Sequence, residues 1–434
     1  MLSRPARLYL LHSAIQTFGL AVWGLFFNLA VLAFGYDRAF LGWLGSAGIA
    51  AAAALSLPLW WLLGRIGLRR ALVLQAGLYA AGALVIALHP SPAALLAAVA
   101  VSAAGAVLAQ LAAQPFMMRH SSAATRDRVF SFAAALAIGV AGLGSLAGGL
   151  LPGTLGGALG VGPESALAYR ATFGVVGAVL ALSVAPLLLM REGAVAVEID
   201  TRRRGDVEAT TRSEEPPGHA RRRVFPAPGL PRCAARVLGE PWPAIIRRPW
   251  PLLRLLVTPC LISWGAALLI PYLNLFLNER FGLSGGALGA TVAALGVATG
   301  LATLAAPLLS ARLGAMPTVV LTEALSLPFL LALGFAPSRE LALGAALARA
   351  ALFNMGAPLY DAYAMARVPE AVRPALSGLL GGASSVGYLL MPPLSVWVQA
   401  RYGFAPLFLA TAACYALATL LNYLLFVWRD ERRR

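Results

Sequence analysis

The chain has 434 residues, of which 59% are hydrophobic and only 12% are charged. Soluble proteins carry about 25% charged residues, so this chain has too few charges to cover a water-facing surface. The formal net charge of +16 would suggest nucleic acid in a soluble protein, but here the charge lies in short segments between apolar runs. The composition therefore excludes a nucleic-acid partner and predicts that a lipid bilayer covers most of the molecule.

Several chemistries are excluded by residue type. Every basic residue is Arg, so the chain lacks the Lys of a P-loop and the Lys of a Schiff base. Its three Cys and four His are scattered and show no spacing typical of a metal site. We therefore expect no metal, no cofactor and no enzymatic activity.

Apolar runs long enough to cross a bilayer occur twelve times, because about 20 residues are needed for one crossing. This pattern predicts an all-α membrane protein with twelve transmembrane helices in two pseudo-symmetric six-helix bundles. The predicted spans are residues 8–34, 39–63, 70–88, 93–118, 129–152 and 168–190, and then 251–277, 284–310, 315–335, 340–366, 374–399 and 404–428.

Three regions follow from these runs. We predict an N-terminal bundle over 1–190, a disordered linker over 191–250 and a C-terminal bundle with a short basic tail over 251–434. Most arginines fall on the side of the N-terminus, and arginine-rich loops stay in the cytoplasm. We therefore expect a multi-pass protein of the inner membrane whose two termini are both cytoplasmic.

The two halves repeat each other at a nearly constant distance along the chain. Arg65-Ile66-Gly67 recurs 247 residues later as Arg312-Leu313-Gly314, and Gly42 recurs as Gly289. Duplicated six-helix halves are typical of transporters that bind their substrate at the interface of the repeats.

Polar residues concentrate in the predicted spans 1, 4, 7 and 10, whereas spans 3, 6, 9 and 12 are nearly pure Ala, Leu and Val. Polar side chains are costly in lipid unless they face a cavity or another helix. We predict that a substrate cavity is lined by Gln16, Asn28, Gln110, Gln114, Asn274, Arg349, Asn354 and Asp361.

The segment from Leu63 to Arg70 resembles the signature of the major facilitator superfamily between spans 2 and 3, although Gly64 replaces the Asp of that signature. The resemblance covers essentially the whole chain. It implies alternating access with a cytoplasmic gate, for which the residues are Arg65, Gly67, Arg128, Arg312, Gly314 and Arg373.

A second motif points to the drug-efflux branch of that family. Gly144-Ser145-Leu146-Ala147-Gly148-Gly149 resembles its antiporter motif, with Ser145 in place of Pro. The resemblance implies that Gly144, Gly148 and Gly149 allow close helix packing, and that the chain exports its substrate.

Individual charges within the spans have two interpretations. Arg349 either contacts an anion or carboxylate or serves as a coupling charge, or else it extends toward the membrane surface or bonds backbone carbonyls. Asp361 either carries a proton or pairs with a nearby Arg. For Glu323, a structural pair with a loop Arg is the favoured interpretation.

Two functions remain open. The first is a monomeric secondary transporter that exports small apolar or amphipathic compounds. The alternative is an uptake symporter for a small polar or anionic solute. Either function would use a proton or a sodium ion as the coupling ion.

Overall fold

The computed structural model describes residues 3–121, 123–190, 250–368 and 373–428. Twelve of its helical segments are long and apolar enough to cross a membrane, which confirms the predicted fold class. The predicted linker over 191–250 lies outside the described residues except for Trp250. The chain is thus an all-α, multi-pass membrane protein in the part that the structure describes.

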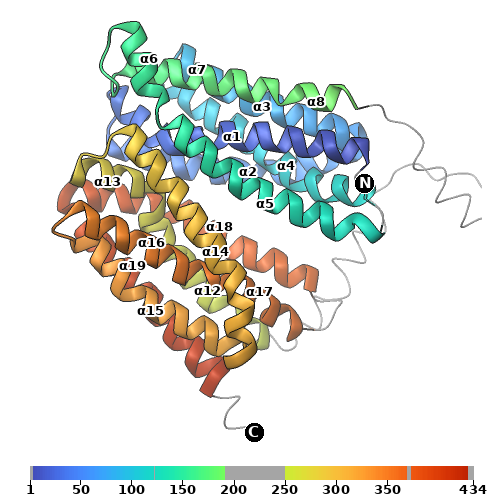
Figure 1. Cartoon of the computed structure of the whole chain (residues 1–434), viewed down its shortest axis with the longest axis vertical. Coiled ribbons are helices and arrows are strands. Elements are labelled where there is room, and N and C mark those ends of the chain that lie inside the picture. The colour runs from blue at the N-terminus through green and yellow to red at the C-terminus, as the bar shows by residue number, and fades with distance from the viewer. Residues whose placement is uncertain (1–2, 122, 191–249, 369–372, 429–434) are drawn as a thin grey trace, which may run out of the picture.

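The first six spans are built from eight helices, seen in blue to green in Figure 1. They are α1 (Arg4–Ala33), α2 (Arg38–Ile66), α3 (Leu68–Leu88), α4 (Pro92–Arg119), α5 (Ala123–Gly148), α6 (Leu151–Leu159), α7 (Ala166–Leu182) and α8 (Val184–Leu188).

The last six spans follow the same order, seen in yellow to red in Figure 1. They are α12 (Trp250–Leu269), η1 (Ile270–Tyr272), α13 (Leu273–Phe281), α14 (Gly285–Leu313), α15 (Ala315–Phe335), α16 (Arg339–Met355), α17 (Ala357–Ala366), α18 (Arg373–Tyr402), α19 (Ala405–Asn422) and η3 (Tyr423–Val427).

The 247-residue repeat is visible in the helix ends. Helices α2 and α14 each have 29 residues, α3 and α15 each have 21, and the members of each pair begin 247 residues apart. Ser91 and Ser338, also 247 residues apart, cap α4 and α16 by accepting a bond from the backbone N–H three residues on. The same cap chemistry therefore starts the same span in both halves.

The sharp reversals between spans repeat as well. Among the residues that the structure describes, six glycines have positive φ, and they form three pairs, namely Gly35 with Gly282, Gly67 with Gly314, and Gly160 with Gly403. A residue with a side chain is strained in this conformation, so glycine is required at such turns.

Several spans differ from the uninterrupted runs expected from the sequence, among them span 6, which is interrupted at Ser183 between α7 and α8. Span 5 extends beyond its predicted end through α6, reaching Leu159. Span 7 is broken by the short helix η1, which contains Pro271, and span 10 is broken at Gly356, just before Pro358. Proline removes a backbone donor and disrupts the regular helical bond pattern, which accounts for the breaks.

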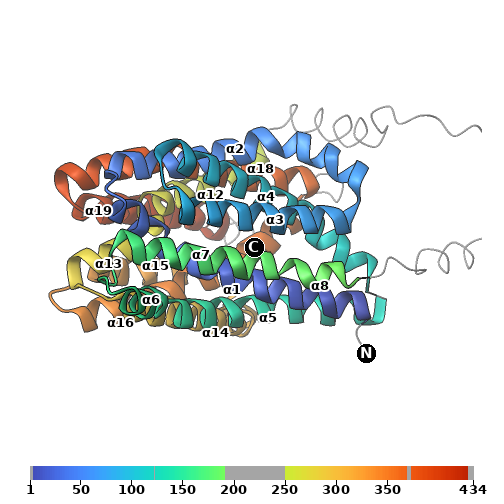
Figure 2. The ribbon, with the colours of Figure 1, turned by 90° about the horizontal axis from the view of Figure 1, so that it is seen from above.

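Two helix pairs form most of the contact between the two halves, and α1 adds smaller contacts with α13 and α14. Helix α2 packs on α18, and α5 packs on α14. Viewed from above, the first pair lies along one edge of the molecule and the second along the opposite edge (Figure 2). The space between the halves is therefore bounded on both sides by helices that belong to different halves.

Candidate substrate cavity between the two halves

The halves are closed against each other at one end only, which we call the closed side. It is the end at which α2 and α14 begin. Gly149, directly after the end of α5, faces α14 so closely that a Cβ there would lie 2.6 Å from the carbonyl oxygen of Gly285. Gly289 is pressed against the backbone of Ser145, and Gly42 is pressed against Val396 of α18. Small residues thus permit the backbone contact of the two halves.

Polar bonds reinforce this closed side. Asn28 Nδ2 donates to the carbonyl oxygen of Pro271 in the break of span 7, and Asn274 Nδ2 donates to the carbonyl oxygen of Leu25 at 3.3 Å. Arg38 pairs with Glu279 at 2.6 Å. Asn28 and Asn274 were predicted to line the cavity, and the structure places both of them in bonds between the halves.

At the opposite end, the open side, the two halves diverge, as the paths of α5 and α14 show in Figure 1. Arg65 and Arg312 both lie there, at the last turns of α2 and α14, and both are exposed. Arg65 stacks on Trp61 at 3.5 Å, and neither Arg takes part in an ion pair with another residue that the structure describes. Gly67 and Gly314 adjoin these helix ends. The side chains of Arg128 and Arg373 lie outside the described residues.

A cavity of about 960 Å³ lies between α5 of the first half and the inner surface of the second half. Its wall is mostly aliphatic, with small residues such as Gly142 and Gly296. Leu269 and Ile270, at the break of span 7, form part of this wall. Arg349 contributes the only charged side chain among the described residues that line it, and Asn354 lies nearby.

Arg349 is held in a buried aromatic setting, with 8% of its surface exposed. Its Nη2 donates to the hydroxyl oxygen of Tyr415 at 3.1 Å, while the buried Nε has no acceptor. The guanidinium carbon lies 5.2 Å from the ring centre of Phe353 and 5.7 Å from that of Tyr415. The side chain therefore does not extend to the membrane surface, which was one of its predicted interpretations.

The remaining predicted cavity residues lie elsewhere. Gln16 is buried inside the first half, where it exchanges hydrogen bonds with Gln75 of α3 at 2.8 and 3.0 Å. Gln110 and Gln114 on α4 and Asp361 on α17 are exposed, and none of the three lines this cavity. Of the eight predicted residues, Arg349 and Asn354 are the two that share the wall.

Close packing is observed at the three glycines of the predicted antiporter motif. A Cβ on Gly144 would lie 2.9 Å from the carbonyl oxygen of Phe18 in α1, and Gly148 is pressed against Val22. Gly149 instead meets the second half, as described above. The sequence pattern predicted close packing at the glycines of α5. It did not predict that the aliphatic face of this helix forms part of the cavity wall.

Two buried polar clusters were also missed. In the first half, His12 Nδ1 lies 2.7 Å from the carbonyl oxygen of Ser183, and its Nε2 lies 3.0 Å from Nε2 of Gln75. Gln75 belongs to span 3, which was expected to be nearly pure Ala, Leu and Val. In the second half, Glu323 accepts a bond from Asn422 at 3.1 Å instead of pairing with a loop Arg. The favoured interpretation of Glu323 was therefore wrong, because the residue faces α19 and not the loop.

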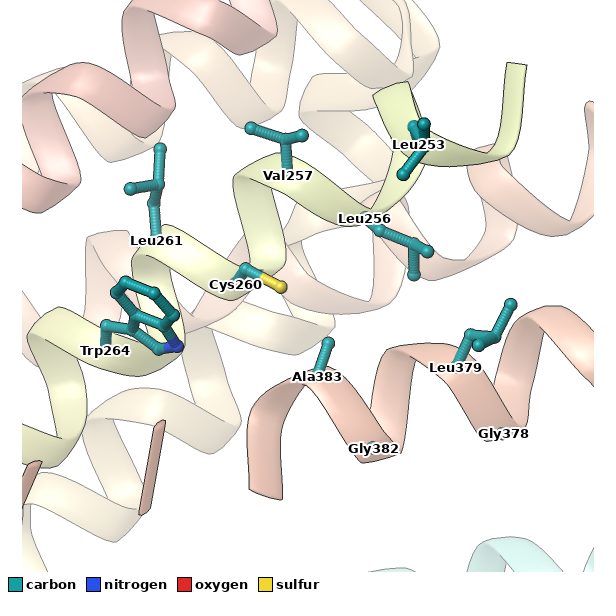
Figure 3. A pocket seen from close by; sticks show the side chains of 10 residues that line it. All are labelled: Leu253, Leu256, Val257, Cys260, Leu261, Trp264, Gly378, Leu379, Gly382 and Ala383. Carbon is teal, nitrogen blue, oxygen red and sulfur yellow. The ribbon is translucent and has the colours of Figure 1, made fainter. Parts of the chain in front are cut away.

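A second cavity, of about 550 Å³, lies between α12 and α18 (Figure 3). Cys260 and Trp264 of α12 line it on one side, and Gly378 and Gly382 of α18 on the other. Its described lining contains no charged side chain, so it offers no recognition of a charged group.

Two halves of six spans, closed at one end around an apolar cavity, are the architecture of a membrane transporter. The family model of the Major Facilitator Superfamily matches residues 11–337 and 255–434, and the chain belongs to this family. No curated protein sequence matches the chain.

Solved transporter structures share the fold at low sequence identity. The chain is similar to a bacterial homologue of the human lysosomal transporter Spinster, with TM-score 0.74, 16% identity and coverage of 97% of this chain and 96% of that one. It is also similar to the nucleoside transporter NupG, with TM-score 0.73, 12% identity and coverage of 98% and 100%. A D-xylose–proton symporter matches with TM-score 0.68, 15% identity and coverage of 97% and 97%. These likenesses support the fold.

Proposed function

We propose that the chain is a secondary transporter that exports a small, largely apolar or amphipathic compound across the cytoplasmic membrane by alternating access. The observation that carries this proposal is the one-sided closure of the halves. Every described bond between them, from Arg38–Glu279 to Ser46–Leu389, lies toward the closed side. The cavity of about 960 Å³ is of the size that accommodates small-molecule ligands.

In this proposal the open side faces the cytoplasm, and both termini are cytoplasmic. The opposite state requires the ends of α2 and α14 to approach each other. Arg65, Gly67, Arg312 and Gly314 lie at these ends and would form the gate, together with Arg128 and Arg373. A proton or a sodium ion would supply the coupling energy.

The direction of export rests on helix packing. Gly144 and Gly148 let α5 pack directly on α1, which is the arrangement that the resemblance to the antiporter motif implies. Uptake of a polar or anionic solute is the second candidate. One observation favours it, which is the buried cation of Arg349 in the cavity wall.

Alternating access can be tested by pulsed electron spin resonance on a variant in which the native Cys are replaced. Spin labels at Arg70 and Ala311 report the open side, and labels at Leu88 and Phe335 report the closed side, since all four residues are exposed. We expect two distance populations for each pair, changing in opposite senses when ligand or pH is varied. A single fixed distance for both pairs under all conditions would refute the proposal.

The gate can be tested separately with a single Cys at Gln114, an exposed position on α4. Labelling from the cytoplasmic side should rise in Arg65→Ala and Arg312→Ala, because closure of the open side would be weakened. A charge-assisted bond of about 1.5–3 kcal/mol is enough to shift a balanced equilibrium more than tenfold. Arg339→Ala, which changes an exposed Arg at the other end, is the control. Equal labelling of all variants would remove these arginines from the gate.

A further inference from the structure

The cavity holds a positive charge that no described residue neutralises. The ion pairs among the described residues are Arg38–Glu279 and Arg339–Glu340, and neither includes Arg349. A guanidinium stays protonated in proteins, so it cannot escape its buried setting by losing a proton. A buried charge is costly unless an opposite charge or hydrogen-bond acceptors surround it. The apparent lack of a partner thus requires a physical explanation.

The guanidinium also has unused donors. One of its five N–H groups is directed to Tyr415, and the buried Nε lacks any acceptor. An unpaired buried donor costs free energy, and this cost disappears when an acceptor arrives. The fork geometry of Arg suits a planar carboxylate, which can accept two parallel bonds. The missing partner is therefore best supplied by a group with two oxygens.

The setting keeps this group in place. The rings of Phe353 and Tyr415 stack at 4.3 Å with an angle of 16° between their planes, and the guanidinium lies over both rings. Such contacts favour a fixed cation. Arg349 is also ten residues from the start of α16, which corresponds to about 15 Å along the axis, near the middle of a bilayer. Headgroups of lipids at the membrane surface are therefore out of reach.

We propose that Arg349 binds the anionic group of the substrate, and that the substrate is a small amphipathic monoanion with one carboxylate on an apolar body. This inference rests on the proposed function and specifies its substrate class. The apolar wall around Leu269 and Ile270 accommodates the body. A phosphate monoester carries a charge of about −1.5 to −2 at neutral pH, and the described cavity wall offers one cation only. A single negative charge matches it.

The test uses three probes that share one body, namely 4-phenylbutanoate, the neutral 4-phenylbutanamide and the cationic 4-phenylbutylamine. Binding is measured by calorimetry on the full chain in nanodiscs, with empty nanodiscs subtracted. We expect the carboxylate to bind at least about tenfold more tightly than the amide, because one charged hydrogen-bond pair is gained. The amine should bind most weakly of the three.

Variants then assign the preference to its residue. Arg349→Gln should bring the ratio of carboxylate to amide affinity close to one, and Arg349→Lys should give an intermediate ratio, because a Lys lacks the planar fork. Tyr415→Phe keeps the ring but removes the acceptor of Nη2, so the carboxylate preference should remain. Arg339→Gln on the same helix is the matched control and should behave like the parent.

The ratio of carboxylate to amide affinity is measured within one variant, so it does not depend on how much folded protein that variant yields. A carboxylate preference that survives in Arg349→Gln, or equal binding of the three probes to the parent, would overturn the assignment. Fixed spin-label distances would instead refute the alternating-access proposal. If the labels move while the probes bind equally, the transporter mechanism stands and the anionic substrate class falls.

Discussion

The two halves share their helix geometry but differ in the polar groups that they bury. In the first half a hydrogen-bonded network joins His12, Gln16 and Gln75 across α1 and α3. At nearly the same place in the second half, 248 residues after Gln75, Glu323 on α15 binds Thr419 and Asn422 of α19. Helix ends and turns have thus been kept through the repeat, whereas the buried side chains have diverged.

The buried carboxyl and guanidinium groups lie in one half. Within the described residues, the buried side chains of Asp, Glu or Arg are Glu323 and Arg349, and both belong to the second half. Amide side chains that bond to each other cost less to bury than a permanent charge such as that of Arg349, which needs a partner of opposite sign. The first half therefore behaves as a structural counterpart, and the second half carries the chemistry that we assign to substrate recognition.

The largest expected effect separates the equivalent glycines Gly42 and Gly289. A Cβ on Gly289 would first meet the backbone carbonyl of Ser145, which cannot move alone, whereas on Gly42 it would first meet a methyl group of Val396, with the backbone of Pro393 at 3.0 Å. We expect Gly289→Ala to cost about 1–3 kcal/mol and to open the closed side, and Gly42→Ala to cost less. Thermal unfolding and the distance between labels at Leu88 and Phe335 would measure both effects.

Gly296→Ala is the control for that series, since no atom lies within 4 Å of its Cβ position. If Gly42→Ala and Gly289→Ala lower the unfolding temperature equally, the destabilisation does not depend on whether the added Cβ meets a backbone or a side-chain atom first.

A medium effect should distinguish the two polar clusters. Glu323→Ala removes the acceptor of Asn422, while Thr419 keeps the carbonyl oxygen of Tyr415 as an acceptor. Gln75→Ala removes the acceptor of Gln16 and the N–H donor that faces His12 Nε2. Hydrogen bonds inside membrane proteins are worth roughly 0.6 kcal/mol on average and up to about 1.7 kcal/mol. We expect about 1–2 kcal/mol for Glu323→Ala and a smaller loss for Gln75→Ala, as measured by denaturant titration in detergent.

The double variant Glu323→Ala with Asn422→Ala gives the matched control for that comparison. The second change should cost little once the acceptor has gone, because the pair then no longer exists. Fully additive losses would show that Glu323 and Asn422 do not stabilise each other.

The smallest expected effect concerns Arg38 and Glu279, the ion pair between the halves. Both side chains are partly exposed, at 28% and 34%, so the pair should contribute less than about 1 kcal/mol. Arg38→Gln should raise accessibility of the closed side a few-fold at low salt and not at high salt, in a cysteine-labelling assay. The same rise in Arg339→Gln, whose partner lies within its own half, would contradict a specific role for the pair.

Much of the fold followed from the sequence, because span length is set by the bilayer and the 247-residue repeat is visible in Arg65-Ile66-Gly67 and Arg312-Leu313-Gly314. Arg349 and Asn354 were found because polar residues are rare in lipid. Gln16 was placed in the wrong surroundings, since a helix that is apolar on all sides gives no periodic signal for the direction that a polar residue faces.

One pair of arginines ties two helices of the first half together at both of their ends. Arg69, at the start of α3, donates to the carbonyl oxygens of Leu187 and Leu188 in α8, the end of the span that α7 begins. Arg170, in α7, donates to the carbonyl oxygens of Ala87 and Leu88 at the end of α3.

This reciprocal attachment links the two spans mechanically. Helix α3 has 21 residues and is about 31 Å long, close to the thickness of the hydrocarbon layer. Because Arg69 and Arg170 fix its two ends against the neighbouring span, neither span can slide or tilt alone when the bilayer becomes thinner or thicker. The two spans should therefore tilt together as one rigid unit. A change in bilayer thickness should then rotate the whole six-helix bundle of the first half.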